Sequence, residues 1–209
     1  MLIIKDYGVE LHQLTEDKIE LVRNWRNSDK ISRYMEFRDY ITPEMQKRWF
    51  SKINETDNQF YFIIVADGKE VGLINIKNVD WNLRTGESGI FIYDDSYLHV
   101  GASYRAALCQ RDFAFRTLHL NTLKAHILNT NSRSIKYNQK FGFVLSADEE
   151  QKPLKECNQM YLLDKEDYFA NKLNIINMLR EKYNFTPPHW RNEYLIFRFL
   201  RYSSNAIAA

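Results

Sequence analysis

The sequence is poor in the features that mark secreted, disulfide-bonded and membrane-spanning proteins. Its 209 residues include two cysteines, Cys109 and Cys157, too few for a disulfide framework, and we interpret both as reduced thiols. The longest apolar run, residues 60–66, is far shorter than the roughly 20 residues that cross a bilayer. The N-terminus has too few consecutive apolar residues for a secretion signal. These absences predict a cytoplasmic protein without a membrane segment.

The chain also lacks a strong net charge. Its 29 basic and 27 acidic residues leave a formal charge of +2, which gives no electrostatic reason to expect nucleic acid or a membrane surface as a partner. The five histidines show no metal-ligand spacing, so we expect no metal site. The sequence has no nucleophile-elbow pattern, which argues against a covalent serine mechanism.

The residues that are present predict one domain with a substantial core, because 44% of them are hydrophobic and 14% aromatic. Apolar runs and alternation predict strands over residues 7–14, 60–66, 70–77, 87–93, 119–128, 144–147 and 159–163. Helical periodicity predicts helices over residues 18–26, 28–34, 102–113, 131–140 and 166–182, and one that begins at Thr42-Pro43-Glu44. Residues 78–86 and 148–155 read as polar loops.

The stretch from Glu87 to Phe143 carries most of the candidate chemistry. A strand at residues 87–93 is followed by a turn and then by a short loop around Gly101 that enters a helix directly. A tight loop at a helix N-terminus offers free backbone N–H groups and the positive end of the helix dipole. This arrangement predicts an anion site.

The order of these elements, with Asn131-Ser-Arg-Ser134-Ile135 and Lys140-Phe-Gly142-Phe143 after the second strand, resembles the GNAT acyltransferase superfamily. The resemblance covers roughly residues 7–170. It implies an α/β (α+β) fold with a mostly antiparallel, splayed sheet and helices on both faces. It also implies a GNAT domain at residues 1–170 and a C-terminal helical extension at residues 171–209, with acetyl-CoA as co-substrate.

The resemblance implies a binding site for the CoA moiety. The backbone of Phe91 and Ile92 would hold the pantetheine arm where two strands splay apart. The remaining contacts implied by the family are His99, Val100, Gly101, Ala102, Ser103, Asn131 and Ser134. The loop departs from the family pattern at Leu98, where Arg or Gln is usual, and at Ser103. We expect a working site of reduced affinity, since backbone N–H groups supply most anion contacts; the alternative is a loop with a structural role only.

The catalytic candidates are Glu87 and Asn138. Glu87 would accept the proton of the attacking ammonium, directly or through water, and the alternative is an exposed loop acid. Asn138 occupies the place where many family members have a Tyr that protonates the leaving thiolate. An amide is no proton donor at neutral pH, and the adjacent Tyr137 is turned by about 100° around the helix. Water can serve instead, because a CoA thiolate is a fair leaving group.

The acceptor candidates lie near the N-terminus. Trp25-Arg26-Asn27 and Arg48-Trp49-Phe50 resemble the region that walls the acceptor site in sugar-nucleotide N-acetyltransferases and in enzymes that acetylate ribosomal-protein N-termini. Arg26 would pair with a substrate phosphate and Trp49 would line the site. The alternatives are a core position for the tryptophans and a C-terminal helix charge for Arg26.

The sequence therefore predicts an N-acetyltransferase that moves an acetyl group from acetyl-CoA to a primary amine, with a nucleotide-linked amino sugar as the preferred acceptor. Acetylation of a protein N-terminus or side chain is the alternative activity. A catalytically inactive acyl-CoA-binding or interaction protein of the same fold is the alternative from another class. We expect a small-molecule amine as partner, and a homodimer is a candidate assembly.

Overall fold

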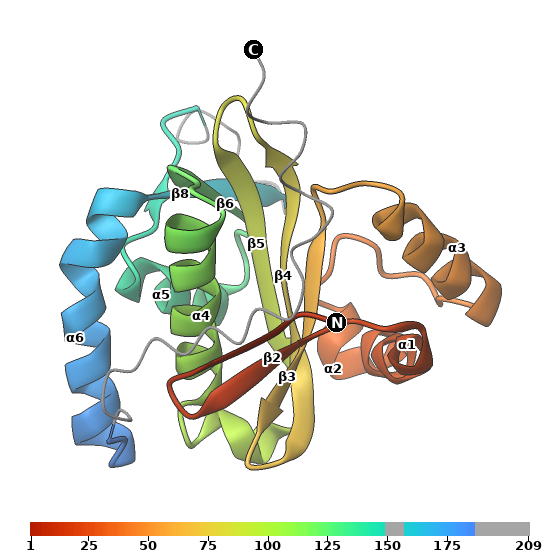
Figure 1. The fold of residues 1–209 in the computed structure, drawn as a ribbon, viewed down its shortest axis with the longest axis horizontal. Coiled ribbons are helices and arrows are strands. Elements are labelled where there is room, and N and C mark those ends of the chain that lie inside the picture. The colour runs from red at the N-terminus through yellow and green to blue at the C-terminus, as the bar shows by residue number, and fades with distance from the viewer. Residues whose placement is uncertain (149–156, 187–209) are drawn as a thin grey trace.

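The computed structural model describes residues 1–148 and 157–186 (Figure 1). The strands are β1 (Ile3–Asp6), β2 (Val9–Gln13), β3 (Phe60–Ala66), β4 (Lys69–Asp80), β5 (Thr85–Ile92), β6 (Thr122–Leu128), β7 (Val144–Leu145) and β8 (Asn158–Asp164). The α-helices are α1 (Ile19–Asn27), α2 (Asp29–Ser32), α3 (Pro43–Asn54), α4 (Ala102–Asp112), α5 (Ser132–Lys140) and α6 (Lys165–Tyr183). Short 3-10 turns, η1 (Glu16–Lys18) and η2 (Asp95–Leu98), precede α1 and α4, and a π-helical turn, η3 (Phe113–Thr117), follows α4.

The strands form one eight-stranded sheet in the order β1-β2-β3-β4-β5-β6-β8-β7. Among the described residues every neighbouring pair is antiparallel except β5 with β6, which are parallel. A parallel pair needs a crossover connection, and α4 supplies it here. The predicted α/β (α+β) fold with a mostly antiparallel sheet is confirmed.

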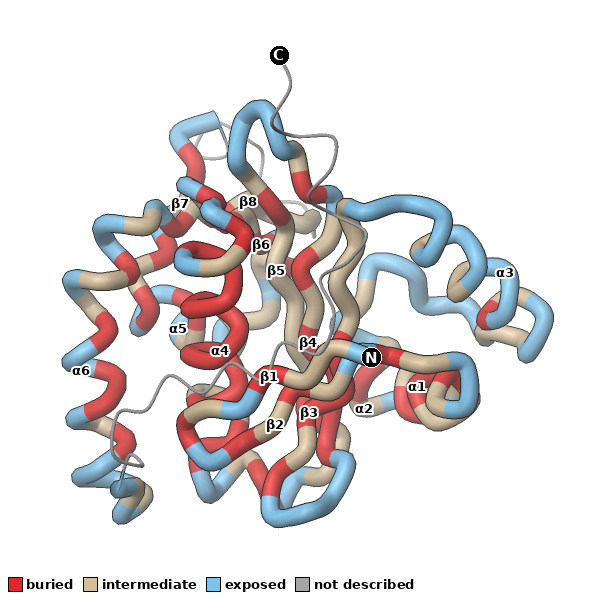
Figure 2. The backbone as a smooth tube through the Cα atoms, viewed as in Figure 1, coloured by how far each residue is buried: buried red, intermediate tan, exposed pale blue. Residues whose placement is uncertain are grey.

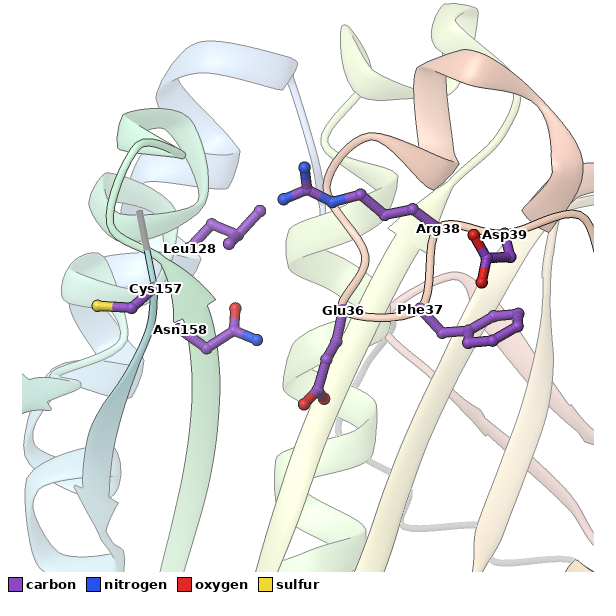
Figure 3. A pocket seen from close by; sticks show the side chains of 7 residues that line it. All are labelled: Glu36, Phe37, Arg38, Asp39, Leu128, Cys157 and Asn158. Carbon is purple, nitrogen blue, oxygen red and sulfur yellow. The ribbon is translucent and has the colours of Figure 1, made fainter. Parts of the chain in front are cut away.

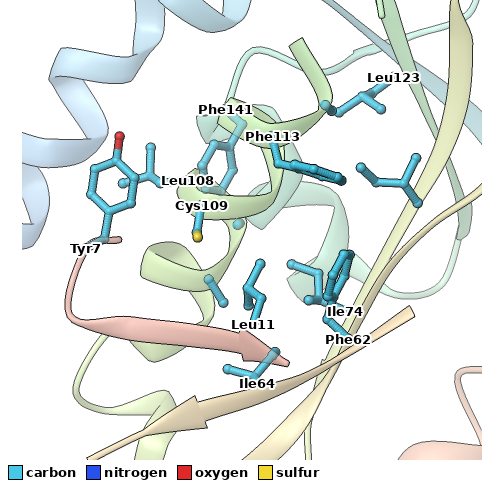
Figure 4. Packing of buried hydrophobic residues seen from close by; sticks show 14 of the residues in the cluster. Tyr7, Leu11, Phe62, Ile64, Ile74, Leu108, Cys109, Phe113, Leu123 and Phe141 are labelled. Atoms are coloured by element: carbon cyan, nitrogen blue, oxygen red, sulfur yellow. The ribbon is translucent and has the colours of Figure 1, made fainter. Parts of the chain in front are cut away.

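Helices cover both faces of the sheet, as predicted (Figure 1). On one face, α4 and α6 pack against the sheet in the main core, part of which Figure 4 shows around Leu11, Phe62, Ile74 and Phe113. On the other face, α1 and α3 cover a smaller cluster. Strand β3 is apolar on both faces for this reason: Phe62 belongs to the main core and its neighbour Ile63 to the smaller cluster.

Helix α4 is buried along almost its whole length (Figure 2). Small residues such as Ala102, Ala106 and Ala107, all fully buried, let it lie close to the sheet. The predicted apolar face of residues 102, 106, 109 and 113 is confirmed, but the helix buries polar residues as well.

A buried ion pair joins α4 to α6. Lys172 Nζ lies 2.6 Å from Asp112 Oδ2, and both side chains are less than a tenth exposed. The hydroxyls of Tyr7 and Tyr168 also donate to Asp112, at 2.6 and 2.8 Å. Helix α6 therefore belongs to the main core, and it runs through residue 170 without a break. A separate extension over residues 171–209 stays a prediction, since residues 187–209, like the predicted loop over residues 149–155, lie outside the described residues.

The single strand predicted at residues 7–14 is wrong in detail, because the chain forms a hairpin of β1 and β2 there. Tyr7 and Gly8 make the turn with φ of 52° and 67°. A left-handed conformation is unusual for tyrosine. Here it is held at both ends: the Tyr7 N–H donates to Asp6 Oδ1 at 2.7 Å, and the hydroxyl donates to Asp112.

Two other boundaries differ from the prediction. Residues 78–86 are mainly strand rather than loop: β4 runs to Asp80 through an irregularity after Lys77, and β5 begins at Thr85. Strand β6 begins at Thr122 rather than at residue 119, because His119 turns the chain with φ of 54° between η3 and the strand.

The buried ion pair gives a stability prediction. Replacing Lys172 by Met keeps the apolar stem but leaves the Asp112 carboxylate buried without its closest cation. We expect a loss of about 3 kcal/mol in the free energy of unfolding, measured by urea denaturation. The control is Lys18→Met, which removes the exposed pair with Glu70 and is expected to cost less than about 1 kcal/mol. Equal losses in the two variants would contradict the importance of the buried pair.

Candidate active site

The centre of the sheet opens between β5 and β6. These strands pair over three positions, Thr85 with Thr122, Gly86 with Leu123 and Glu87 with Lys124. Beyond them β5 continues to Ile92, paired with β4 on its other side, and β6 continues to Leu128, paired with β8. Within the described residues, the facing edges of residues 88–92 and 125–128 pair with no strand. They leave backbone N–H and C=O groups for a ligand, which is the splay that the resemblance implies.

The backbone of Phe91 and Ile92 lies on this open edge. Their side chains point to opposite faces: Ile92 is buried in the main core, and the Phe91 ring meets Trp25 edge-to-face at 6.2 Å. Side-chain packing and a backbone contact to pantetheine are thus compatible. The contact itself stays a prediction.

The predicted anion loop leads into the N-terminus of α4. Gly101 is the residue before the helix and has φ of 72°, the left-handed region that favours glycine. His99 and Val100 are exposed, Ala102 is buried and Ser103 is half-buried. A Cβ at residue 101 would lie 2.9 Å from the side chains of Leu179 and Tyr183, so Gly101 also allows α6 to pack closely against the loop.

Helix α5 braces this loop from the side. The Tyr137 hydroxyl donates to the Ser103 carbonyl at 2.9 Å, which holds the first turn of α4. Asn131 caps α5, and its Oδ1 accepts from the Ser134 N–H at 3.1 Å. Asn131 is therefore the N-cap of α5, and the contacts of Asn131 and Ser134 with a cofactor stay predictions. Burial raises the pKa of Tyr137, so its hydroxyl keeps its proton.

Asn138 is buried and faces the interior rather than the open edge. Its Nδ2 donates to the Ser134 carbonyl at 2.9 Å, and its Oδ1 lies 3.5 Å from Arg111 Nη2. Arg111 is fully buried against the ring of Phe141, with its guanidinium carbon 4.0 Å from the ring centre. These contacts give Asn138 a structural role. A catalytic role for it stays a prediction.

Glu87 lies where the two strands begin to separate. Its Oε2 is 3.2 Å from Lys77 Nζ on β4 and 3.6 Å from His126 Nδ1 on β6. The side chain of Glu87 is 20% exposed, against 40% for His126. Glu87 is therefore a paired, half-buried carboxylate, and the alternative of an exposed loop acid is wrong.

These neighbours set the protonation of Glu87. His126 first, and then Asn78 and Lys77, lower the pKa of Glu87 from the usual 4.5 to about 2, against the opposing effect of burial. Glu87 in turn raises the pKa of His126 above 6.5, while burial opposes it. The carboxylate is thus ionised at neutral pH and is a weak proton acceptor.

The two acceptor candidates lie on the face covered by α1 and α3. Arg26 Nη2 lies 3.4 Å from the Phe37 carbonyl, so this side chain steadies the chain between α2 and α3. Burial lowers the pKa of Arg26. The Trp49 ring meets Tyr61 edge-to-face at 5.0 Å and is half-buried. Their contact with substrate stays a prediction.

A pocket of about 470 Å³ opens on the same side of the molecule (Figure 3). One wall is the segment between α2 and α3, and the other is formed by the end of β6 and the start of β8. Its lining residues are Glu36, Phe37, Arg38, Asp39, Leu128, Cys157 and Asn158. This mixture of acids, a base and an aromatic ring suits a polar acceptor.

The pocket and the partners of Glu87 were not predicted from the sequence. Strand alternation in the sequence places His126 on the same strand face as Lys124, two residues earlier. The proximity of His126 to Glu87 depends on the parallel register of β5 and β6, which no local pattern specifies. The pocket residues 36–39 lie in a segment without periodicity.

No group of three or more metal-ligating side chains, and no helix able to cross a membrane, occurs within residues 1–148 and 157–186.

The splayed parallel pair, its buried crossover helix and the glycine loop are the features that the resemblance to the GNAT superfamily implies. A sequence model of the acetyltransferase (GNAT) domain matches residues 9–144. The chain belongs to the GNAT family, and it is an acyltransferase enzyme, an N-acetyltransferase.

The chain is similar to the following three proteins, among others. The acetyltransferase PseH of Campylobacter jejuni strain 81-176 is 27% identical over 133 residues, which cover 64% of this chain and 81% of PseH. Spermidine N(1)-acetyltransferase of Escherichia coli K12 is 23% identical over 142 residues, 68% of this chain and 76% of that enzyme. The solved structure of apo FdhC, a nucleotide-linked sugar GNAT, shares the fold with a TM-score of 0.68 at 19% identity, covering 85% of this chain and 98% of FdhC.

The low pKa of Glu87 predicts pH-dependent stability. Because the pKa of Glu87 is lower in the folded protein than in the unfolded chain, the carboxylate stabilises the fold above about pH 4.5 and loses this effect as the pH falls toward 2. We expect Glu87→Gln to cost about 1–2 kcal/mol at pH 7, a value reduced for partial exposure, and the cost to shrink as the pH is lowered to 3.

Urea denaturation from pH 3 to 8 measures this difference. The matched control is Glu10→Gln, because Glu10 also lies between a lysine and a histidine, Lys5 at 2.8 Å and His12 at 2.6 Å, but on a more exposed part of the sheet. Its loss should stay below about 1 kcal/mol. A Glu87→Gln cost that does not change with pH would contradict the low pKa.

Proposed function

We propose that this enzyme transfers the acetyl group of acetyl-CoA to the primary amine of a nucleotide-linked amino sugar. The observation that carries the proposal is the open edge of β5 beside the N-terminus of α4. Residues 88–92 offer backbone groups to an extended pantetheine arm. The first turn of α4 offers N–H groups and dipole charge to the pyrophosphate.

The anion loop supports CoA binding despite its departures from the family pattern. Its sequence between η2 and α4 contains no proline, so each residue from His99 to Ser103 brings an N–H. The Tyr137 hydroxyl and the close contact of α6 hold the loop in place before a ligand arrives. The family usually has Arg or Gln at the position of Leu98, and losing that side chain lowers the affinity for CoA. The preorganised loop offsets part of this loss.

The choice of acceptor rests on the relatives and on the pocket. FdhC, a nucleotide-linked sugar GNAT, supports a nucleotide-linked sugar as acceptor, and PseH supports acetyl transfer. Arg38 in the pocket and Arg26 behind it are suited to phosphate groups. Spermidine is the second candidate acceptor, favoured by the carboxylates Glu36 and Asp39 and by the Escherichia coli relative.

We also propose that the protein assembles into a homo-oligomer in the cytoplasm, a homodimer being the smallest form. A spermidine N-acetyltransferase from Vibrio cholerae that shares this fold is dodecameric. Analytical ultracentrifugation gives the assembly state directly.

Calorimetric titration with acetyl-CoA tests the cofactor site. We expect a micromolar Kd for the wild type and a loss of at least about tenfold for Ser103→Glu, since a carboxylate in the first turn of α4 repels phosphates while remaining favourable for the helix. Ala170→Glu, an exposed position on α6, adds the same charge as a control. A change at Gly101 is less suitable, because any side chain there also displaces α6.

Thiol release from acetyl-CoA then tests the acceptor, with UDP-glucosamine, spermidine and a short peptide with a free N-terminus as amines. Preferred turnover of UDP-glucosamine supports the proposal. Preferred turnover of spermidine or of the peptide would show that this amine, and not a nucleotide-linked amino sugar, is the acceptor. No acetyl-CoA binding at millimolar concentration would overturn acetyl transfer itself.

A further inference from the structure

Glu87 is poorly suited to be the proton acceptor of the reaction. Its Oε2 already faces the ammonium group of Lys77, with Nζ at 3.2 Å, and the imidazole of His126, with Nδ1 at 3.6 Å. A carboxylate stabilised in this way has little tendency to take a proton from an ammonium group. An imidazole beside it is the better base at neutral pH.

His126 lies on β6, beyond the point where β5 and β6 separate. It follows Lys124, the last residue of β6 that pairs with β5, by two positions. His126 therefore shares a strand face with Lys124 and Leu128, and Leu128 lines the pocket. Its side chain is twice as exposed as that of Glu87, 40% against 20%, so the imidazole is more accessible from solvent than the carboxylate.

The orientation of the ring suits proton transfer. Nδ1 faces the Glu87 carboxylate, so Nε2 lies on the opposite side of the ring. Among the described residues Nε2 has no hydrogen-bond partner. At 3.6 Å the carboxylate favours a proton on Nδ1 by its charge, which leaves Nε2 to accept a proton, and it stabilises the imidazolium that forms.

We propose that His126 is the general base of acetyl transfer, accepting the proton of the acceptor's ammonium group at Nε2, and that Glu87 is the positioning residue that orients its ring. The inference rests on the proposed acetyl-transfer function and adds a residue to it.

The proposed step conserves atoms and charge. The acceptor's ammonium gives one proton to neutral His126 and becomes an amine. The amine nitrogen forms a bond to the acyl carbon, the carbon–sulfur bond breaks, and its electron pair leaves on the CoA sulfur. The second proton lost by the nitrogen reaches the thiolate through solvent, giving CoA thiol, and His126 returns its proton to water.

The charged groups around His126 set its working pH. Glu87 on β5 and Glu36 in the pocket raise the pKa of His126, while burial and Lys77 on β4 lower it. On β6 itself the nearest titratable side chain on this face is Lys124, and the facing residue on β8 is the neutral Met160. The base must be neutral to act, so the rate rises with pH through the raised pKa of His126.

The test uses the full chain, acetyl-CoA and either UDP-glucosamine or spermidine, whichever the wild type acetylates. We expect His126→Gln to lower kcat/KM by about 10²–10⁴-fold, with little change in the Kd of acetyl-CoA. The matched control is His12→Gln, which removes a histidine paired with Glu10 at 2.6 Å on β2 and should leave the rate unchanged.

The pH profile of Glu87→Gln separates a positioning role from catalysis by Glu87 itself. Without the carboxylate the pKa of His126 falls, so the acidic limb of kcat/KM should move to lower pH while a reduced rate remains. An acidic limb that stays in place in Glu87→Gln, or a His126→Gln variant as active as the wild type, would overturn the proposal and leave acetyl transfer intact. A wild type that neither binds acetyl-CoA nor acetylates an amine would overturn the proposed function, and this inference with it.

Discussion

The site depends on one constraint, that β5 and β6 pair for three positions and then separate. Backbone polar groups in the middle of a sheet must find partners, and here two facing edges have none among the described residues. The separation is fixed on both outer sides, because β4 holds β5 as far as Ile92 and β8 holds β6 as far as Leu128. The gap between β5 and β6 is therefore fixed by the pairing of these strands with β4 and β8.

The crossover helix connects this gap to the anion loop. Two parallel strands that are neighbours require a connection across the sheet, and the chain uses α4. The helix starts just beyond the end of β5, so its N-terminus lies at the open end of the strand pair. The buried pair of Asp112 and Lys172 and the contact of Gly101 with Leu179 and Tyr183 hold α4 against α6. Stability of the core and the geometry of the site thus share the same contacts.

Local sequence signals were sufficient where local chemistry decides the structure. The helix start at Thr42 is present as predicted, because a side-chain oxygen facing its own helix N-terminus needs no distant partner. The fold class followed from the order of the elements and the family resemblance. The turn at Tyr7 was missed because Asp112, far along the chain, holds its hydroxyl. The neighbours of Glu87 were missed for the same reason, since His126 comes close only through strand register.

The departure at Asn138 has a physical reason that the sequence alone does not reveal. Arg111 is a buried cation whose guanidinium stacks on Phe141 and donates to the Ala107 carbonyl at 3.2 Å. The amide oxygen of Asn138 lies 3.5 Å from the same guanidinium. A phenol at this position would replace a carbonyl-type acceptor with a hydroxyl and would need space beside a fully buried side chain. The amide therefore serves the interior. In the proposed reaction the departing thiolate takes its proton from solvent, and the exposed imidazole of His126 at the opening is the side chain proposed to take the proton of the acceptor.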